Sequence, residues 1–218
     1  MPKDTFFNLP EKKRKRILSV LLDAFASGAY QDVSIDQIVD QAGISKGSFY
    51  QYFEDKQDCY LYLIQLTVDE KIRFMADFNS SSEERDPFQL LQTIIQAGLD
   101  FQFSNPRLGQ IAYRAAFEDA PLPADTRDVI RTSSQSYFEN MLKEGIEAGV
   151  IRDGIDPGVG AFILNAVFIN LGEFILAQHQ LDAGDLLTEG TSLFDQEEIH
   201  QTIQLVLDAL ENGYKKNQ

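Results

Sequence analysis

The stretch from Val33 to Lys56, VSIDQIVDQAGISKGSFYQYFEDK, holds two short helical patterns separated by a glycine. Ser34 and Gln37 form an S-x-x-Q capping box that opens the first helix. Gly43 stands where the end of a helix needs a residue that tolerates a positive φ. Ser45 can then cap the second helix. Two helices joined by a short glycine turn within about twenty residues are typical of a helix-turn-helix.

The second helix of this stretch has two faces of different chemistry. Phe49 and Phe53, four residues apart, are predicted to make its core contact. The rest of its surface carries small, hydrogen-bonding or cationic groups, and the helix dipole favours phosphate near its N-terminus. This combination indicates a DNA-reading helix, and the alternative is a helical hairpin that binds no nucleic acid. We expect DNA contacts from Ser34, Ser45, Lys46, Gly47, Ser48, Tyr50, Gln51, Tyr52 and Lys56.

The pattern GISKGSFYQYFEDK, from Gly43 to Lys56, follows a basic first helix and resembles the DNA-binding domain of tetracycline-repressor-type (TetR) regulators. The resemblance covers roughly residues 10 to 60, and beyond it only the spacing of the helices is similar. It implies a transcriptional repressor that binds a palindromic DNA operator as a dimer and is released by a small-molecule effector. The alternative is a DNA-bound architectural or recruiting factor without an effector.

The net charge of −15 is distributed unevenly along the chain. Residues 1–56 carry eight basic and eight acidic side chains, so the whole negative charge belongs to the remainder. The basic run Lys12–Arg16 supplies the local positive face that phosphate contact requires. Taken alone, such a run would equally fit a solvated helix face.

Helix-start signals recur along the rest of the chain. Three dipeptides, Asp86-Pro87, Asn105-Pro106 and Asp156-Pro157, place a capping residue before a proline at the first helical position. Asn8 with Glu11 and Asp195 with Glu198 form candidate capping boxes. We expect helices near residues 11–28, 35–42, 46–52, 56–78, 87–103, 106–118, 123–148, 157–179 and 197–215.

These nine helices, without a convincing strand, predict an all-α fold of two domains. Residues 1–56 would form a three-helix helix-turn-helix domain that binds DNA. Residues 57–218 would form a larger helical domain for effector binding and dimerisation. A chain of 218 residues, 44% of them hydrophobic, is long enough to bury a sizeable core.

Catalytic and metal chemistry find no support in the sequence. His179 and His200 have no second ligand at metal-binding spacing, and no phosphate-binding loop or nucleophile motif occurs. We therefore expect no cofactor and no enzyme, an enzyme acting on a small hydrophobic substrate being the less favoured alternative. Cys59, the only cysteine, reads as a buried hydrophobe, with a redox sensor as the minor alternative.

The sequence also favours a cytoplasmic location. A single cysteine excludes an internal disulfide, as expected in a reducing compartment. The N-terminal residues lack the apolar run of a signal peptide. The longest apolar stretch, residues 158–177, is interrupted by Asn165, Asn170 and Glu173, so we expect no membrane span.

Two further sites are expected in the larger domain. Aromatic residues with a few polar groups among them are typical of a small-molecule pocket, although each alone fits ordinary core packing. The predicted pocket residues are Ile64, Phe101, Tyr113, Phe117, Tyr137, Asn165 and Glu173. The last helix repeats apolar residues at bundle spacing, and the helix at 157–179 is rich in small residues. We expect a homodimer interface, rather than packing within the monomer, at Phe162, Ile169, Ile199, Ile203, Val206 and Leu210.

Overall fold

The computed structural model describes residues 1–79, 86–118, 120–123, 126, 128–129, 132, 134–189, 192 and 197–215. These residues contain eleven helices and no strand, apart from one isolated antiparallel bridge between Ile151 and Lys215. The all-α prediction is therefore confirmed. The chain forms two compact units: Met1–Ile72 with Arg107–Arg127, and Arg73–Pro106 with Asp128–Gln218.

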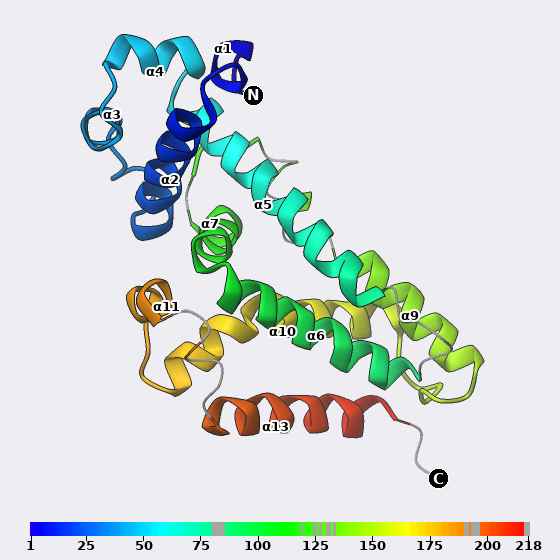
Figure 1. The fold of residues 1–218 in the computed structure, drawn as a ribbon. Helices are drawn as coiled ribbons and strands as arrows, with labels where there is room; N and C mark the ends of the chain where they lie inside the picture. Colours follow the sequence, from blue (N-terminus) through cyan, green and yellow to red (C-terminus); the bar gives the residue numbers. More distant parts are fainter. Residues whose placement is uncertain are drawn as a thin grey trace. The chain divides into compact units, whose positions relative to one another are not determined.

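The first unit is built on three helices that share a small apolar core. These are α2 (Glu11–Ser27), α3 (Ile35–Ala42) and α4 (Lys46–Tyr52), with the short α1 (Asp4–Phe7) beside α4 (Figure 1). Each helix turns one apolar stripe inward, as its periodicity predicts. The fully buried side chains of this core include Phe6, Ile17, Leu21, Phe25, Ile38, Phe49 and Phe53.

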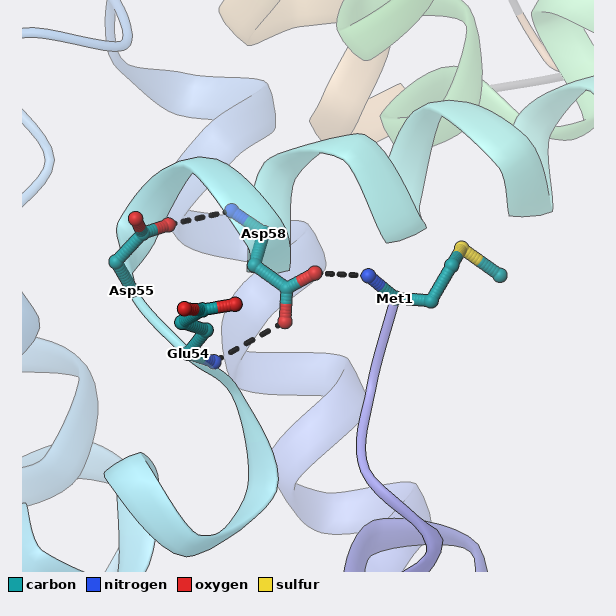
Figure 2. A network of polar contacts seen from close by, with 4 residues as sticks. All are labelled: Met1, Glu54, Asp55 and Asp58. Atoms are coloured by element: carbon teal, nitrogen blue, oxygen red, sulfur yellow. Dashed lines mark hydrogen bonds and ion pairs between the residues drawn. The ribbon is translucent and has the colours of Figure 1, made fainter.

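The long helix α5 (Lys56–Asn79) begins at a network of carboxylates (Figure 2). An oxygen of Asp55 accepts a hydrogen bond from the backbone N–H of Asp58 at 2.7 Å, which confirms Asp55 as the cap. The Asp58 carboxylate in turn accepts from the backbone N–H of Glu54 at 3.1 Å and from the amino group of Met1. Further along, Cys59 is fully buried, and this burial raises the pKa of its thiol well above the usual value.

Helix α7 (Pro106–Phe117) packs on α2 although the two are far apart in sequence. The Arg107 guanidinium donates to Ser19 Oγ at 3.2 Å and to Asp23 Oδ1 at 3.0 Å. Arg114 Nε donates to the carbonyl oxygen of Ala26 at 3.1 Å. By these contacts α7 belongs to the first unit. A functional boundary between residues 56 and 57 stays a prediction.

The second unit consists of α6 (Pro87–Ser104), α9 (Gln135–Glu147), α10 (Pro157–Gln178), α11 (Ala183–Glu189) and α13 (Glu197–Tyr214). Asp86 caps α6 through the N–H of Phe88, and Asp156 caps α10 through the N–H of Val159. Both proline-marked starts are therefore confirmed. The core takes buried residues from all five helices, among them Ile95, Phe138, Leu164, Leu186 and Ile203.

Close packing in this unit depends on a glycine in α10. A Cβ added at Gly160 would lie 2.7 Å from Leu142 Cδ1 of α9 and 3.1 Å from Tyr214 Cε1. The hydroxyl of Tyr214 also donates to the Gly160 carbonyl oxygen at 3.1 Å. Small residues in α10 were predicted to admit a second chain. At Gly160 the close neighbour is instead the chain's own α9 and α13.

Several helix boundaries differ from the predictions. The Asn8–Glu11 box does not form, since α2 begins after Pro10 and Asn8 ends α1, an unpredicted helix. Helix α7 begins at Pro106 as predicted, but Asn105 closes α6, and its side-chain amide donates to the Phe101 carbonyl oxygen at 3.2 Å. The helix expected at 123–148 is seen as α9, and the short α11 was not predicted. Asp195 lies outside the described residues.

Helix α10 also differs from the expectation about membrane spans. By length and composition alone, Pro157–Gln178 is apolar enough to cross a membrane, because its polar residues, Asn165, Asn170, Glu173 and Gln178, are only four of 22. Such a helix is equally typical of a protein core. Leu164, Ile175 and Leu176 are buried in the core of the second unit, where α10 packs on α9, α6 and α13.

Candidate nucleic-acid interface

The turn between α3 and α4 has the geometry that its glycine predicts. Gly43 adopts φ 60° and ψ 45°, a left-handed conformation. Its N–H donates to the Asp40 carbonyl oxygen at 3.0 Å, and the N–H of Ile44 donates to that of Val39 at 2.9 Å. This pair of bonds is a Schellman motif, which ends α3 sharply. Ser45, two residues after Gly43, can then cap α4.

Helix α4 starts on a side-chain cap, as predicted. Ser45 Oγ accepts from the backbone N–H of Ser48 at 3.0 Å and lies 2.9 Å from Ser48 Oγ. The predicted capping box of α3 does not form, because the side chain of Ser34 makes no cap bond in the structure. Ser34 is half-buried at the start of α3, and its contact with DNA stays a prediction.

The two faces of α4 divide largely as predicted. Phe49 and Phe53 are fully buried, and their ring centroids lie 5.3 Å apart. Ser48 is half-buried. We call the exposed residues of this helix and its cap the reading face: Ser45, Lys46, Gly47, Tyr50 and Gln51.

Tyr52 does not belong to the reading face, which corrects the prediction. Its side chain is 5% exposed and packs against Phe6, with ring centroids 6.1 Å apart. The reason is helical geometry, because Tyr52 is three residues from Phe49 and therefore shares its inward side. The ammonium of Lys13 lies 5.8 Å from the Tyr52 ring centroid, so α2 covers this side as well.

Lys56 also has a different role from the one predicted. Its ammonium donates to the carbonyl oxygens of Tyr30 at 2.8 Å and Val33 at 3.0 Å, and lies 4.4 Å from the Tyr30 ring centroid. The Lys56 ammonium is therefore hydrogen-bonded to the segment before α3. Lys56 therefore stabilises that turn, and phosphate contact through its side chain is not supported.

Positive charge near the reading face comes from α2 and from Lys46. In the basic run, Lys12 and Arg16 are exposed, whereas Arg14 donates to the Phe7 carbonyl oxygen at 2.7 Å. Lys46 pairs with Asp36 of α3 at 2.7 Å. The hydrogen bond and charge of Asp36 raise the pKa of Lys46, which keeps this amine protonated.

The predicted pocket residues are divided between the two units. Ile64, Tyr113 and Phe117 belong to the first unit, where the last two rings lie 4.9 Å apart. In the second unit Phe101 is buried against Phe74, Asn165 is buried in α10, Glu173 is half-buried and Tyr137 is exposed. A pocket formed by these seven residues stays a prediction.

An exposed apolar surface on α10 and α13 was only partly anticipated. We call it the apolar face: Val159, Phe162, Ile163, Phe174 and Leu205. Two open hollows, of about 510 and about 450 Å³, are lined by α10 and α13 residues that include Ile163, Phe174 and Val206. Phe162 lines the smaller hollow and Leu210 the larger. In the sequence, each of these two helices carries more apolar residues than its inward side can hold. That excess is the pattern that could have predicted the apolar face.

Three of the residues predicted for a dimer interface, Ile199, Ile203 and Leu210, are buried in the core of the second unit. Ile199 and Ile203 are buried among residues of α6, α9 and α10. A bundle-type repeat describes any helix with an apolar stripe, and here the stripe faces the chain's own core. Ile169 is half-buried. Phe162 and Val206 lie at the apolar face or in the hollows beside it, and the buried Leu210 also lines the larger hollow.

Comparison with known proteins agrees with this geometry. Residues 17–63 match the bacterial regulatory proteins of the tetR family, and residues 85–215 match the tetracyclin repressor-like C-terminal domain. The crystal structure of a TetR family transcriptional regulator from Chloroflexus aurantiacus J-10-fl is 45% identical, covers all of both chains and has a TM-score of 0.88.

More distant similarities also span most of the chain. The transcriptional regulator RutR of Escherichia coli O157:H7 is 24% identical over 207 residues, 93% of this chain and 91% of RutR. The regulator FadR from Bacillus subtilis, solved in complex with stearoyl-CoA, is 16% identical with a TM-score of 0.63, over 88% of this chain and 97% of FadR. The C-terminal match alone spans more than half of the chain. The protein therefore belongs to the TetR family of helix-turn-helix transcriptional regulators.

Proposed function

We propose that this regulator is a homodimeric repressor that binds a palindromic operator and is released by a small-molecule effector. The observation that carries the proposal is the reading face, in which α4 presents hydrogen-bonding and cationic groups on a helix fixed by two buried phenylalanines. Such a helix can enter the major groove and contact base edges. Family members are regulators and not enzymes, which supports the expectation that the chain catalyses no reaction and acts in the cytoplasm.

A dimer is supported by the apolar face. Leu205 is 70% exposed and Phe162 is 62% exposed, and the two hollows beside them are largely apolar. A contiguous exposed apolar patch indicates an interaction surface. A second copy is the partner that fits the function, because two half-sites are read by two recognition helices. We place the interface at the apolar face together with Val206 and Leu210.

The effector is proposed to be a small molecule with an apolar part. The relative FadR was solved with stearoyl-CoA, which supports this class of ligand. Helix α5 connects the units covalently, since its residues to Ile72 belong to the first unit and those from Arg73 to the second. A ligand that favours one setting of α5 would need only about 1–3 kcal/mol of coupling to change operator affinity.

One observation favours the alternative without an effector. A cavity in the core of the second unit, lined by residues that include Phe88, Met141 and Leu164, has a volume of only about 10 Å³. This is roughly the volume that one water molecule requires. At this place the core has no room for an effector, which would suit an architectural or recruiting factor whose DNA binding no ligand changes.

Selection of binding sequences from random duplex DNA tests the main proposal. We expect enrichment of a palindrome whose half-sites are separated by about one helical turn or a multiple of it. Native mass spectrometry of the purified protein then tests for a retained ligand. Release of operator by the extracted compound would support the effector-responsive repressor. Operator binding that no extract changes would favour the alternative, and failure to enrich any sequence would refute both.

A further inference from the structure

The C-terminal end of α4 is capped by a segment that comes from the start of the chain. The last four carbonyls of a helix have no partner within the helix. In α4 these belong to residues 49–52. The Phe49 carbonyl oxygen accepts from the N–H of Phe53 at 2.9 Å. Each of the other three accepts from residue 3 or residue 5.

Lys3 supplies two of these three bonds. Its ammonium donates to the Tyr50 carbonyl oxygen at 2.9 Å, and its backbone N–H donates to that of Tyr52 at 2.8 Å. The hydroxyl of Thr5 donates to the remaining carbonyl, that of Gln51. A cation at the C-terminal end of a helix also complements the helix dipole. All four terminal carbonyls of α4 therefore have donors.

The segment is itself held firmly in the first unit. Phe6 is fully buried, with its ring centroid 5.0 Å from that of Phe53 and 5.8 Å from that of Tyr62. The Phe7 carbonyl oxygen accepts from Arg14 Nη1 of α2 at 2.7 Å. Residues 3–7 thus connect the end of α4 to α2 and α5 through both apolar and polar contacts.

A helix of seven residues needs such support. Isolated helices shorter than about 12–15 residues are marginal in water, so α4 keeps its direction only through its surroundings. The Ser45 cap fixes its N-terminal end, and Phe49 fixes one side. The contacts of Lys3 and Thr5 fix the other end, directly behind Tyr50 and Gln51 of the reading face.

We propose that residues 3–6 act as a clamp that sets the direction of the recognition helix α4, with Lys3 and Thr5 as its positioning residues. The inference rests on the proposed DNA-binding function and adds a specificity device to it. A contact with phosphate would strengthen binding to all DNA alike. The clamp instead acts through the alignment of the side chains that contact bases. It therefore affects the affinity for the operator and leaves the affinity for random DNA nearly unchanged.

Thr5→Val is the sharpest variant, because it removes the hydroxyl with little change in shape and none in charge. We expect the Kd for the selected operator to rise roughly two- to tenfold, as for one lost hydrogen bond. The Kd for a random duplex of equal length should change less than twofold. Thr5→Ser keeps the hydroxyl and should restore operator affinity. Fluorescence anisotropy at fixed salt measures each constant.

Thr188→Val is the matched control, since the Thr188 hydroxyl also donates to a backbone carbonyl, that of Gly184, but in the second unit. It should leave the ratio of the operator and random-DNA dissociation constants unchanged. Amide hydrogen exchange of the protein without DNA is a second, independent test of the clamp. In Thr5→Val the amides of residues 46–53 should exchange faster, while those of residues 35–42 serve as the internal reference.

The clamp is refuted if Thr5→Val weakens operator and random binding equally, or if operator affinity and exchange in residues 46–53 both stay at wild-type values. A wild-type protein that selects no DNA sequence would instead refute the proposed function. The exchange experiment would then still test the clamp as a cap on α4, with unchanged exchange counting against it. The two failures are therefore distinguishable.

Discussion

Among the described residues, the reading face and the apolar face are exposed surfaces that are built in opposite ways. The reading face lies on a helix of seven residues, supported at its start by Ser45 and at its end by Lys3 and Thr5. The apolar face lies on two long helices, α10 and α13, whose other sides form the core of the second unit. One surface needs local hydrogen bonds to hold its shape, and the other needs only the core beneath it.

This difference indicates how each surface recognises a partner. The groups of the reading face can exchange hydrogen bonds with water for hydrogen bonds with base edges and phosphates. Such bonds form only when the side chains point in the right direction. The apolar face gains free energy from the area it removes from water, which is far less sensitive to direction. Changes at the apolar face should therefore alter assembly as a whole, whereas changes at the reading face should alter the choice of sequence.

The largest effect is expected from a charge on the apolar face. Leu205→Asp should weaken dimerisation by about 3 kcal/mol or more, because the proposed interface would bury an unpaired carboxylate. Since Leu205 is exposed in the monomer, the variant should remain folded. Sedimentation equilibrium should then detect monomers, and operator affinity should fall at least a hundredfold.

Gln204→Asp is the control for this prediction. It adds the same charge one residue away, at an exposed position of α13 that does not line the two hollows. This variant should dimerise and bind operator almost normally. If Leu205→Asp still sediments as a dimer with wild-type operator affinity, the interface lies elsewhere and the apolar face has another partner.

A smaller effect is expected from the reading face. Gln51→Ala should weaken operator binding by roughly 1–3 kcal/mol, the range for one lost bidentate base contact. Random DNA should bind as before, because Gln51 carries no charge. Competition binding with operator variants would identify the base pair at which the preference is relaxed. Equal losses on operator and random DNA would show that Gln51 does not read bases.

The parts of the fold that were predictable are those with local signals. The turn at Gly43, the cap at Ser45 and the helix start at Asp156 each depend on residues within five positions of one another. The inward positions of Phe49 and Phe53 follow from helical periodicity in the same way. Tyr52 obeys that periodicity too: it lies three residues from Phe49 and shares the inward side of the helix, although it was predicted to contact DNA.

The parts that were not predictable depend on contacts between distant residues. Lys56 bonds to carbonyls 23 and 26 residues earlier, and Lys3 bonds to one 47 residues later. No pattern along the chain identifies a backbone carbonyl as the partner of a lysine. Helix α10 poses a different difficulty, since it is apolar on nearly every side and its periodicity cannot tell the core from an interface.

The smallest expected effect concerns the acid beside the reading face. The Lys46 ammonium is 2.7 Å from an oxygen of Asp36, and both side chains are exposed. In a complex with DNA, a phosphate would compete with Asp36 for this cation, and the carboxylate would repel the backbone. Asp36→Asn removes both effects. Because exposed ion pairs are weak, operator and random DNA should each bind at most about fivefold more tightly, with the preference between them unchanged.

Asp32→Asn makes the same change in net charge in the segment before α3, where Asp32 is exposed. This control separates the effect of the Asp36–Lys46 pair from the effect of the net charge of the unit. Asp32→Asn should tighten DNA binding by less than half as much as Asp36→Asn. Titrations at several salt concentrations would measure the difference, which should shrink as salt screens it. Weaker operator binding by Asp36→Asn would mean that Asp36 aims Lys46 at the DNA. The pair would then belong with the Ser45 cap and the clamp of residues 3–6, as a third contact that holds the reading face in its direction.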